Sequence, residues 1–254
     1  MKLPKLSLLV LHESIAKNIL GIHFFYVIVL FLLISFAQGA PDVFARRDLF
    51  LDGGVTVLFL FSLFFSMTVT FPMIPTDLKE NRLLVFLSTY VSRSSYVLHK
   101  ALGAALTIAI NHLILCVMTS LSLYIVYETH PDWLFTVYWA ILLESLLLGS
   151  AILFFSVTLS RFMALMSSGF LFLIGHFTYY IEYYVNQLGS PLAGKIILNL
   201  YTLLPNFELF GLKNAFLTSK GIPDFYLIWL SVYASGWILV FLLGTSFWME
   251  KKEF

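Results

Sequence analysis

Polar side chains that could do chemistry stand in the middle of long apolar runs of this sequence. Asn111 and His112 share one run, Glu144 lies in the next, and His176 lies in the one after it. If each run is a helix that crosses a membrane, a rise of about 1.5 Å per residue places all four side chains near mid-depth. An ionisable group is costly to bury at that depth, so its presence there points to a function.

Four interpretations of these side chains are open. They could form a buried hydrogen-bonded network between helices, with Glu144 protonated or paired with a histidine. Glu144 could instead line a substrate path at a dimer interface, or the group could relay protons in a secondary transporter. Two histidines and a glutamate could also hold zinc, but the sequence lacks H-E-x-x-H or a comparable spacing. We therefore predict no metal ligands, no catalytic residues and no cofactor.

The stretch GSPLAGKI at 189–196 is one residue short of the phosphate-binding pattern G-x-x-x-x-G-K-[ST]. Ile196 stands where the pattern requires a hydroxyl group to coordinate magnesium. The preceding IEYYVNQL does not have the composition of the buried strand that leads into such a loop. We expect a Gly/Pro turn between two interfacial helices here, and no nucleotide site.

The composition is that of a membrane protein. Hydrophobic residues make up 60% of the chain and charged residues 11%, against roughly 45–50% and about 25% in soluble domains. The formal net charge of +1 argues against a nucleic-acid partner. The single cysteine, Cys116, excludes an intramolecular disulfide and a cysteine-rich metal site.

The apolar runs predict an all-α, polytopic fold with one transmembrane domain over residues 1–254. Several runs approach or exceed the ~20 residues that a helix needs to cross a bilayer. The six expected crossings are 19–37, 55–74, 102–127, 134–157, 163–181 and 226–248.

The positions of the basic residues predict the orientation of these crossings. An even number of crossings puts both termini on the same side of the membrane. With the termini inside, ten of the 15 Lys and Arg residues lie in cytoplasmic segments and five in external ones. Since cytoplasmic loops carry an excess of Lys and Arg, both termini are predicted to be cytoplasmic.

Residues 6–18 have the pattern of an amphipathic helix. Leu8, Leu11 and Ile15 recur at helical spacing, and Glu13 and Lys17 form an i,i+4 pair on the opposite face. Such a helix would lie along the cytoplasmic membrane surface. The alternative is a cytoplasmic extension of the first crossing.

The connection between the second and third crossings contains a predicted short helix at 77–90. Asp77 could cap its start, with Glu80 completing the reciprocal cap. Arg93 lies in a Ser-Arg-Ser-Ser stretch that ends the pattern. A capped amphipathic helix in a cytoplasmic loop could rest on lipid headgroups or dock in the groove of a partner protein. Its apolar stripe consists of Leu83, Phe86, Leu87 and Tyr90.

The long connection at 182–225 precedes the last crossing and falls on the external side. Its apolar and polar residues alternate with helical spacing around Pro205 and Gly211. Backbone groups that dip into a bilayer must be satisfied internally, so we expect short helices packed at the outer leaflet.

These segments resemble those of type 2 permeases of ATP-binding-cassette (ABC) exporters. The stretch at 203–214, LLPNFELFGLKN, is similar to the "LPN-x-E-x-F-x-L" stretch of the permease branch associated with multicopper-enzyme maturation. The chain departs from the family pattern at Asn81-Arg82, where a Gly-Thr pair is usual, and at Tyr90, where proline is frequent. The features shared in the cytoplasmic loop are Glu80, Leu83-Leu84, Leu87-Ser88, Ser92-Arg93 and Lys100.

The resemblance implies a permease subunit that is not itself an enzyme. It would work as a dimer with itself or with a similar permease, in a bacterial inner (plasma) membrane. A separate cytoplasmic ATPase subunit would bind the coupling helix at 77–90, and the surface helix would brace the bundle. Three alternatives remain: a proton- or ion-coupled secondary transporter that uses Glu144, a membrane enzyme acting on lipids or quinones, and a structural membrane subunit.

Overall fold

The computed structural model of the chain describes residues 19–80, 82, 92–129, 131–187, 194, 197, 199, 202–217 and 222–251. In these ranges the regular structure is helical. The predicted surface helix at 6–18 and the stripe residues Leu83, Phe86, Leu87 and Tyr90 lie outside them. The elements in chain order are α2 (Ile19–Ala37), α3 (Val43–Thr70), α4 (Met73–Lys79), α6 (Arg93–Tyr127), α7 (Leu134–Thr158), α8 (Arg161–His176), α9 (Thr178–Gln187), η1 (Glu208–Phe210), α11 (Lys213–Leu217) and α12 (Tyr226–Lys251).

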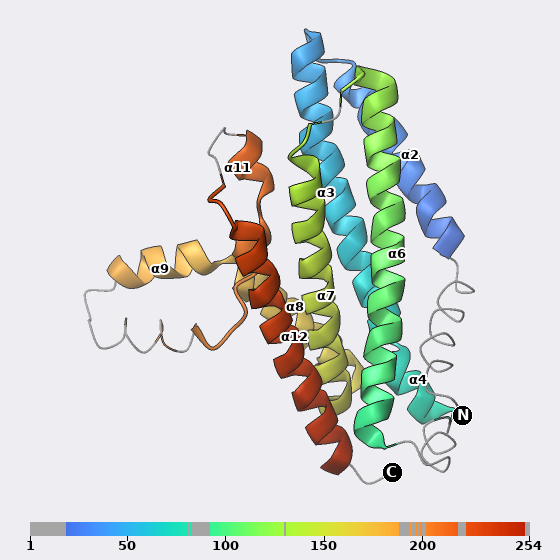
Figure 1. Ribbon diagram of the computed structural model, residues 1–254, viewed down its shortest axis with the longest axis vertical. Helices are drawn as coiled ribbons and strands as arrows, with labels where there is room; N and C mark the ends of the chain where they lie inside the picture. Colours follow the sequence, from blue (N-terminus) through green and yellow to red (C-terminus); the bar gives the residue numbers. More distant parts are fainter. Residues whose placement is uncertain are drawn as a thin grey trace.

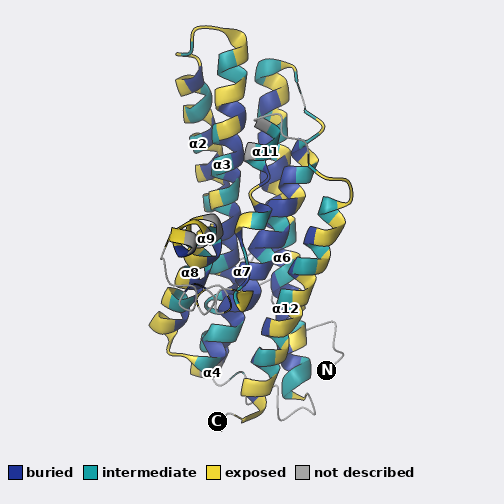
Figure 2. Ribbon diagram, turned by 90° about the vertical axis from the view of Figure 1, so that its left-hand side faces the viewer, coloured by how far each residue is buried: buried dark blue, intermediate teal, exposed yellow. Residues whose placement is uncertain are grey.

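The long helices α3, α6, α7 and α12 run along the long axis of the molecule, and α2 leans against α3 (Figure 1). Helix α7 is the centre of the bundle, since α3, α6, α8 and α12 all pack against it. Its residues are apolar on every side and most of them are buried, as the dark ribbon of Figure 2 shows. A helix that is hydrophobic all round is expected in this central position.

Four helical stretches are long and apolar enough to cross a membrane: Val43–Asp77, Arg93–Tyr127, Leu134–Thr158 and Tyr226–Lys251. They coincide with the second, third, fourth and sixth predicted crossings. Helices α2 and α8, at the first and fifth predicted crossings, are apolar but shorter. The all-helical character predicted from the sequence is therefore confirmed for the described residues, and four of their helices are suited to cross a membrane.

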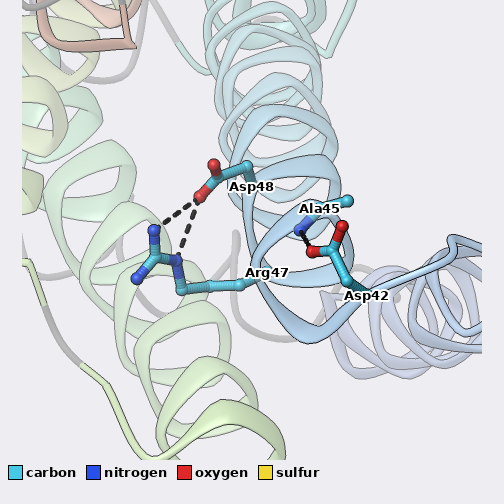
Figure 3. A network of polar contacts seen from close by, with 4 residues as sticks. All are labelled: Asp42, Ala45, Arg47 and Asp48. Carbon is cyan, nitrogen blue, oxygen red and sulfur yellow. Dashed lines mark hydrogen bonds and ion pairs between the residues drawn. The ribbon is translucent and has the colours of Figure 1, made fainter.

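Helix α3 begins twelve residues before the predicted start of the second crossing, at Val43 rather than residue 55. Asp42 caps this start, because its carboxylate accepts a hydrogen bond from the backbone N–H of Ala45 at 2.7 Å (Figure 3). Gly53, two residues before the predicted start of the crossing, does not break the helix. It lets α2 approach closely, since a Cβ at this position would lie 2.7 Å from the side chain of Leu33.

The end of this crossing also differs from the prediction. Helix α3 ends at Thr70, four residues before the predicted end at 74, and Pro75 lies inside α4. Proline is tolerated there because Pro75 is in the first turn of α4, where its missing N–H would have no helical acceptor.

The predicted fifth crossing, 163–181, is broken at Phe177, where α8 ends and α9 turns sideways out of the bundle (Figure 1). The segment before η1 packs against this break, and the N–H of Phe207 donates to the carbonyl of Gly175 at 3.0 Å. A Cβ at Gly175 would lie 2.4 Å from Phe207 and 2.6 Å from the carbonyl oxygen of Pro205. Only glycine leaves room for this approach.

Candidate functional site

The structure brings Glu144 and His176 into direct contact. Glu144 Oε1 lies 2.7 Å from His176 Nε2, between the middle of α7 and the last residue of α8. The Glu144 side chain is 2% exposed and the His176 side chain 28% exposed. The carboxyl group is therefore enclosed in the bundle and the imidazole forms its boundary with the surroundings.

Aromatic rings surround the imidazole of His176. The ring centroids of Phe172 and Phe207 lie 4.5 and 5.9 Å from it, and that of Phe59 lies 6.2 Å away. These rings come from α8, from the segment before η1 and from α3. The break after His176 and the packing of Phe207 thus hold the imidazole over the carboxyl group.

This geometry suits the sharing of a proton. Whether the proton resides on the carboxyl group or makes the imidazole cationic, one hydrogen bond joins the two groups at 2.7 Å. Moving His176 away would leave a buried carboxyl group without this partner, which costs free energy in an apolar surrounding. The pair can therefore act as a tie between α7 and α8 or as a proton-binding site.

His112 makes a separate set of contacts. Its Nδ1 lies 2.8 Å from the Ser62 hydroxyl and its Nε2 lies 2.9 Å from the carbonyl oxygen of Tyr138. A neutral imidazole with the proton on Nε2 satisfies both, since it donates to the carbonyl and accepts from the hydroxyl group. His112 thereby joins α3, α6 and α7, with Cys116 Sγ 3.2 Å from its Nε2.

Asn111 faces its own helix. Its Nδ2 donates to the carbonyl of Thr107 at 2.7 Å, and its buried Oδ1 has no hydrogen-bond partner in the described part of the chain. Among the described residues no hydrogen bond links Asn111 or His112 to the Glu144–His176 pair. Of the four side chains that the sequence singled out, Glu144 and His176 therefore pair with each other, and Asn111 and His112 make separate contacts.

Asp77 is the centre of a second buried polar cluster, with Tyr96 and Lys100. Its Oδ2 lies 2.6 Å from Lys100 Nζ and accepts a hydrogen bond of 2.6 Å from the Tyr96 hydroxyl. We call these three residues the basal cluster, because they join α4 to the start of α6 at the lower end of the bundle in Figure 1.

The basal cluster corrects the expectation that Asp77 and Glu80 cap a new helix. Asp77 lies within α4, and its carboxylate is used by the cluster. The N–H of Glu80, which the cap would need, donates to the carbonyl of Thr76 at 3.0 Å. The Glu80 carboxylate pairs instead with Arg82 at 2.5 Å.

Arg93, the first residue of α6, binds the end of α12. Its Nη1 donates to the carbonyl oxygens of Met249 and Glu250 at 3.0 and 2.9 Å. Beside it, the Ser94 hydroxyl donates to Glu250 Oε1 at 2.6 Å. The guanidinium group thus satisfies carbonyls that have no partner within the helix and places positive charge at its negative end.

One polar contact lies at the start of the segment predicted to couple to a partner, and the other lies beyond its end. Asp77, the first residue of the segment at 77–90, is held by α6, and Arg93, three residues beyond residue 90, is held by α12. Tyr96 and Lys100 were not predicted from the sequence as partners of Asp77. Their i,i+4 spacing puts them on one face of a helix and was the available signal.

Within the described residues, no group of three or more His, Cys, Asp or Glu side chains is placed to hold a metal ion. Comparison of the chain with models of known protein families gives no match, and comparison with curated proteins gives none. The resemblance to exporter permeases therefore rests on the sequence motifs alone.

Proposed function

We propose that the chain is the permease subunit of an ATP-driven ABC exporter, with six crossings and both termini in the cytoplasm of a bacterial cell. Two copies, or one copy and a similar permease, would form the transport path. A separate cytoplasmic ATPase would bind the segment at 77–90.

The observation that carries this proposal is the anchoring of that segment at both ends. The basal cluster ties the start of the segment to α6. Arg93, three residues beyond the end of the segment, binds the end of α12. If a bound ATPase pushed on the segment between these two contacts, α4, α6 and α12 would move together. The central helix α7 packs against each of these three helices, so it would carry the motion through the bundle.

The experiment is to tag the chain in its native host, solubilise it mildly and identify what co-purifies. We expect a soluble ATPase that is lost when Leu83, Phe86 and Leu87 are changed to Asp. The matched control is Leu203→Asp, because Leu203 is exposed and belongs to the connection expected on the external side. An ATPase retained by the triple variant would overturn the proposed coupling segment. Loss of the ATPase from Leu203→Asp would show that the effect is not specific to this segment.

A proton-coupled secondary transporter is the second candidate, because Glu144 and His176 share a hydrogen bond and the imidazole is partly exposed. In that case the purified chain alone, in vesicles, would move protons in a manner that Glu144→Gln abolishes. Proton movement that is unchanged in Glu144→Gln would exclude this candidate.

A further inference from the structure

A lateral groove of about 750 Å3 runs along the outside of α6 and α7. Its twelve lining residues lie between Ala109 and Tyr124 on α6 and between Phe135 and Leu142 on α7. Its volume is within the range of roughly 300–1,000 Å3 that is typical of small-molecule sites. The parts of α6 and α7 that line it lie toward the end of the bundle that holds the α6–α7 connection, away from the start of α6 (Figure 1).

The groove lies between membrane-spanning helices and opens to their surroundings. Its walls carry the exposed side chains of Leu113, Val117 and Phe135, whereas His112 and Cys116 on its floor are buried. Both α6 and α7 are long and apolar enough to cross a membrane. The groove therefore opens to lipid.

The polar atoms on the floor are already used within the protein. His112 is bonded to Ser62 and to the backbone of Tyr138, and the Tyr138 hydroxyl lies 3.2 Å from the Ser120 hydroxyl. At the wall, Trp139 Nε1 donates to Ser231 of α12 at 3.0 Å. A ligand therefore meets carbon surface along the groove, which favours an alkyl chain over a polar molecule.

The length of the groove fits the same class of ligand. From Ala109 to Tyr124 the helix rises by about 22 Å at roughly 1.5 Å per residue, against a hydrocarbon thickness of about 30 Å. Tyr124 is exposed near the end of α6, where an amphipathic ring suits the membrane–water boundary. An extended acyl chain can therefore lie in the groove with its headgroup beside Tyr124.

The area of the groove argues against a second copy of the chain as its occupant. A stable protein interface takes about 20–30 residues from each partner, and twelve residues line this groove. We propose that the groove is a binding site for one acyl chain of a membrane phospholipid, taken from the leaflet that holds the α6–α7 connection. This inference requires only that α6 and α7 cross a membrane, and it is independent of the proposed transport function.

The test uses the full chain in phosphatidylcholine vesicles that contain a phosphatidylcholine with a diazirine midway along one acyl chain. After illumination, we expect cross-linked peptides to concentrate at 109–124 and 135–142. Val117→Trp fills the groove from its exposed wall and should reduce this cross-linking about tenfold. The matched control is Leu243→Trp, because Leu243 is 69% exposed on α12 and lies outside the groove, as against 57% for Val117.

Even labelling of all lipid-facing helices, or cross-linking that survives Val117→Trp, would overturn the acyl-chain site. Cross-links from one copy of the chain to another along the groove would also overturn it, in favour of a subunit interface. If Val117→Trp does not yield folded protein, Leu113→Trp takes its place, because Leu113 is also an exposed wall residue.

Discussion

Asp77 and Lys100 form an ion pair of 2.6 Å inside the bundle, with both side chains 3% exposed. The Tyr96 hydroxyl donates to the same carboxylate oxygen. A charge pair in such a place is costly to desolvate, and removing one partner is costlier still because the other is left buried. The pair therefore makes the position of α4 on α6 sensitive to single substitutions.

Lys100→Met should destabilise the protein by about 3–5 kcal/mol, the cost of a buried carboxylate without its counter-charge. Replacing both members, as in Asp77→Leu with Lys100→Met, should recover most of this loss, because an apolar pair avoids the desolvation penalty. The measurement is reversible unfolding of the purified protein in mixed micelles. A double variant as unstable as Lys100→Met would contradict the pairing.

Tyr96→Phe is the milder variant of the same cluster. It removes one hydrogen bond to a charged oxygen and leaves the ion pair in place, so about 1.5–3 kcal/mol should be lost. In a Lys100→Met background its effect should change, because the two partners share one acceptor atom. Strict additivity in a double-mutant cycle would show that the two contacts are independent.

His176→Ala should destabilise the bundle more than Glu144→Gln does. The first variant leaves a buried carboxyl group without its partner and should cost about 1–3 kcal/mol. The second keeps a side chain of similar size that can still hydrogen-bond to the imidazole. Unfolding in micelles measures both. Equal losses would mean that an amide cannot replace the carboxyl group in the hydrogen bond to His176.

Gly175→Ala should be destabilising by about 1–3 kcal/mol, because its Cβ would meet Phe207 and the carbonyl of Pro205 at 2.4 and 2.6 Å. Gly169 is the matched control on the same helix, since a Cβ there has no neighbour within 4 Å. Gly169→Ala should be neutral or stabilising by up to about 1 kcal/mol. Thermal unfolding compares the two. A neutral Gly175→Ala would contradict the close packing of the 205–207 segment.

Arg93→Ala should loosen the end of α12, because it removes two hydrogen bonds and a charge near the helix terminus. We expect faster amide hydrogen exchange over 247–251. Arg93→Lys keeps the charge without the planar donor geometry. Its exchange rate over 247–251 should therefore fall between those of the wild type and Arg93→Ala. Exchange in Arg93→Lys as fast as in Arg93→Ala would assign the effect to geometry, and unchanged exchange in both would exclude the contact.

The long apolar elements could be predicted from the sequence, because a continuous run of apolar residues largely determines where a membrane helix lies. The predicted first crossing, 19–37, ends where α2 ends, and the predicted fourth, 134–157, ends one residue before α7 does.

The errors come from contacts between segments far apart in the chain. The second crossing was predicted to start at residue 55, but α3 begins at Val43 and Gly53 within it packs against Leu33 of α2. The break after His176 depends on Phe207, and the environment of Asp77 depends on Lys100. In each case the local residues permit more than one conformation, and the distant partner selects one of them.

The central position of α7 has a consequence for biogenesis. When α7 leaves the ribosome, Glu144 has no partner yet, because His176 follows 32 residues later. A carboxyl group facing lipid alone is unfavourable, so we expect α7 to remain beside the insertion machinery until α8 arrives, and the two to enter the bilayer as a hairpin. Helix α12, synthesised after α8, then packs against α7.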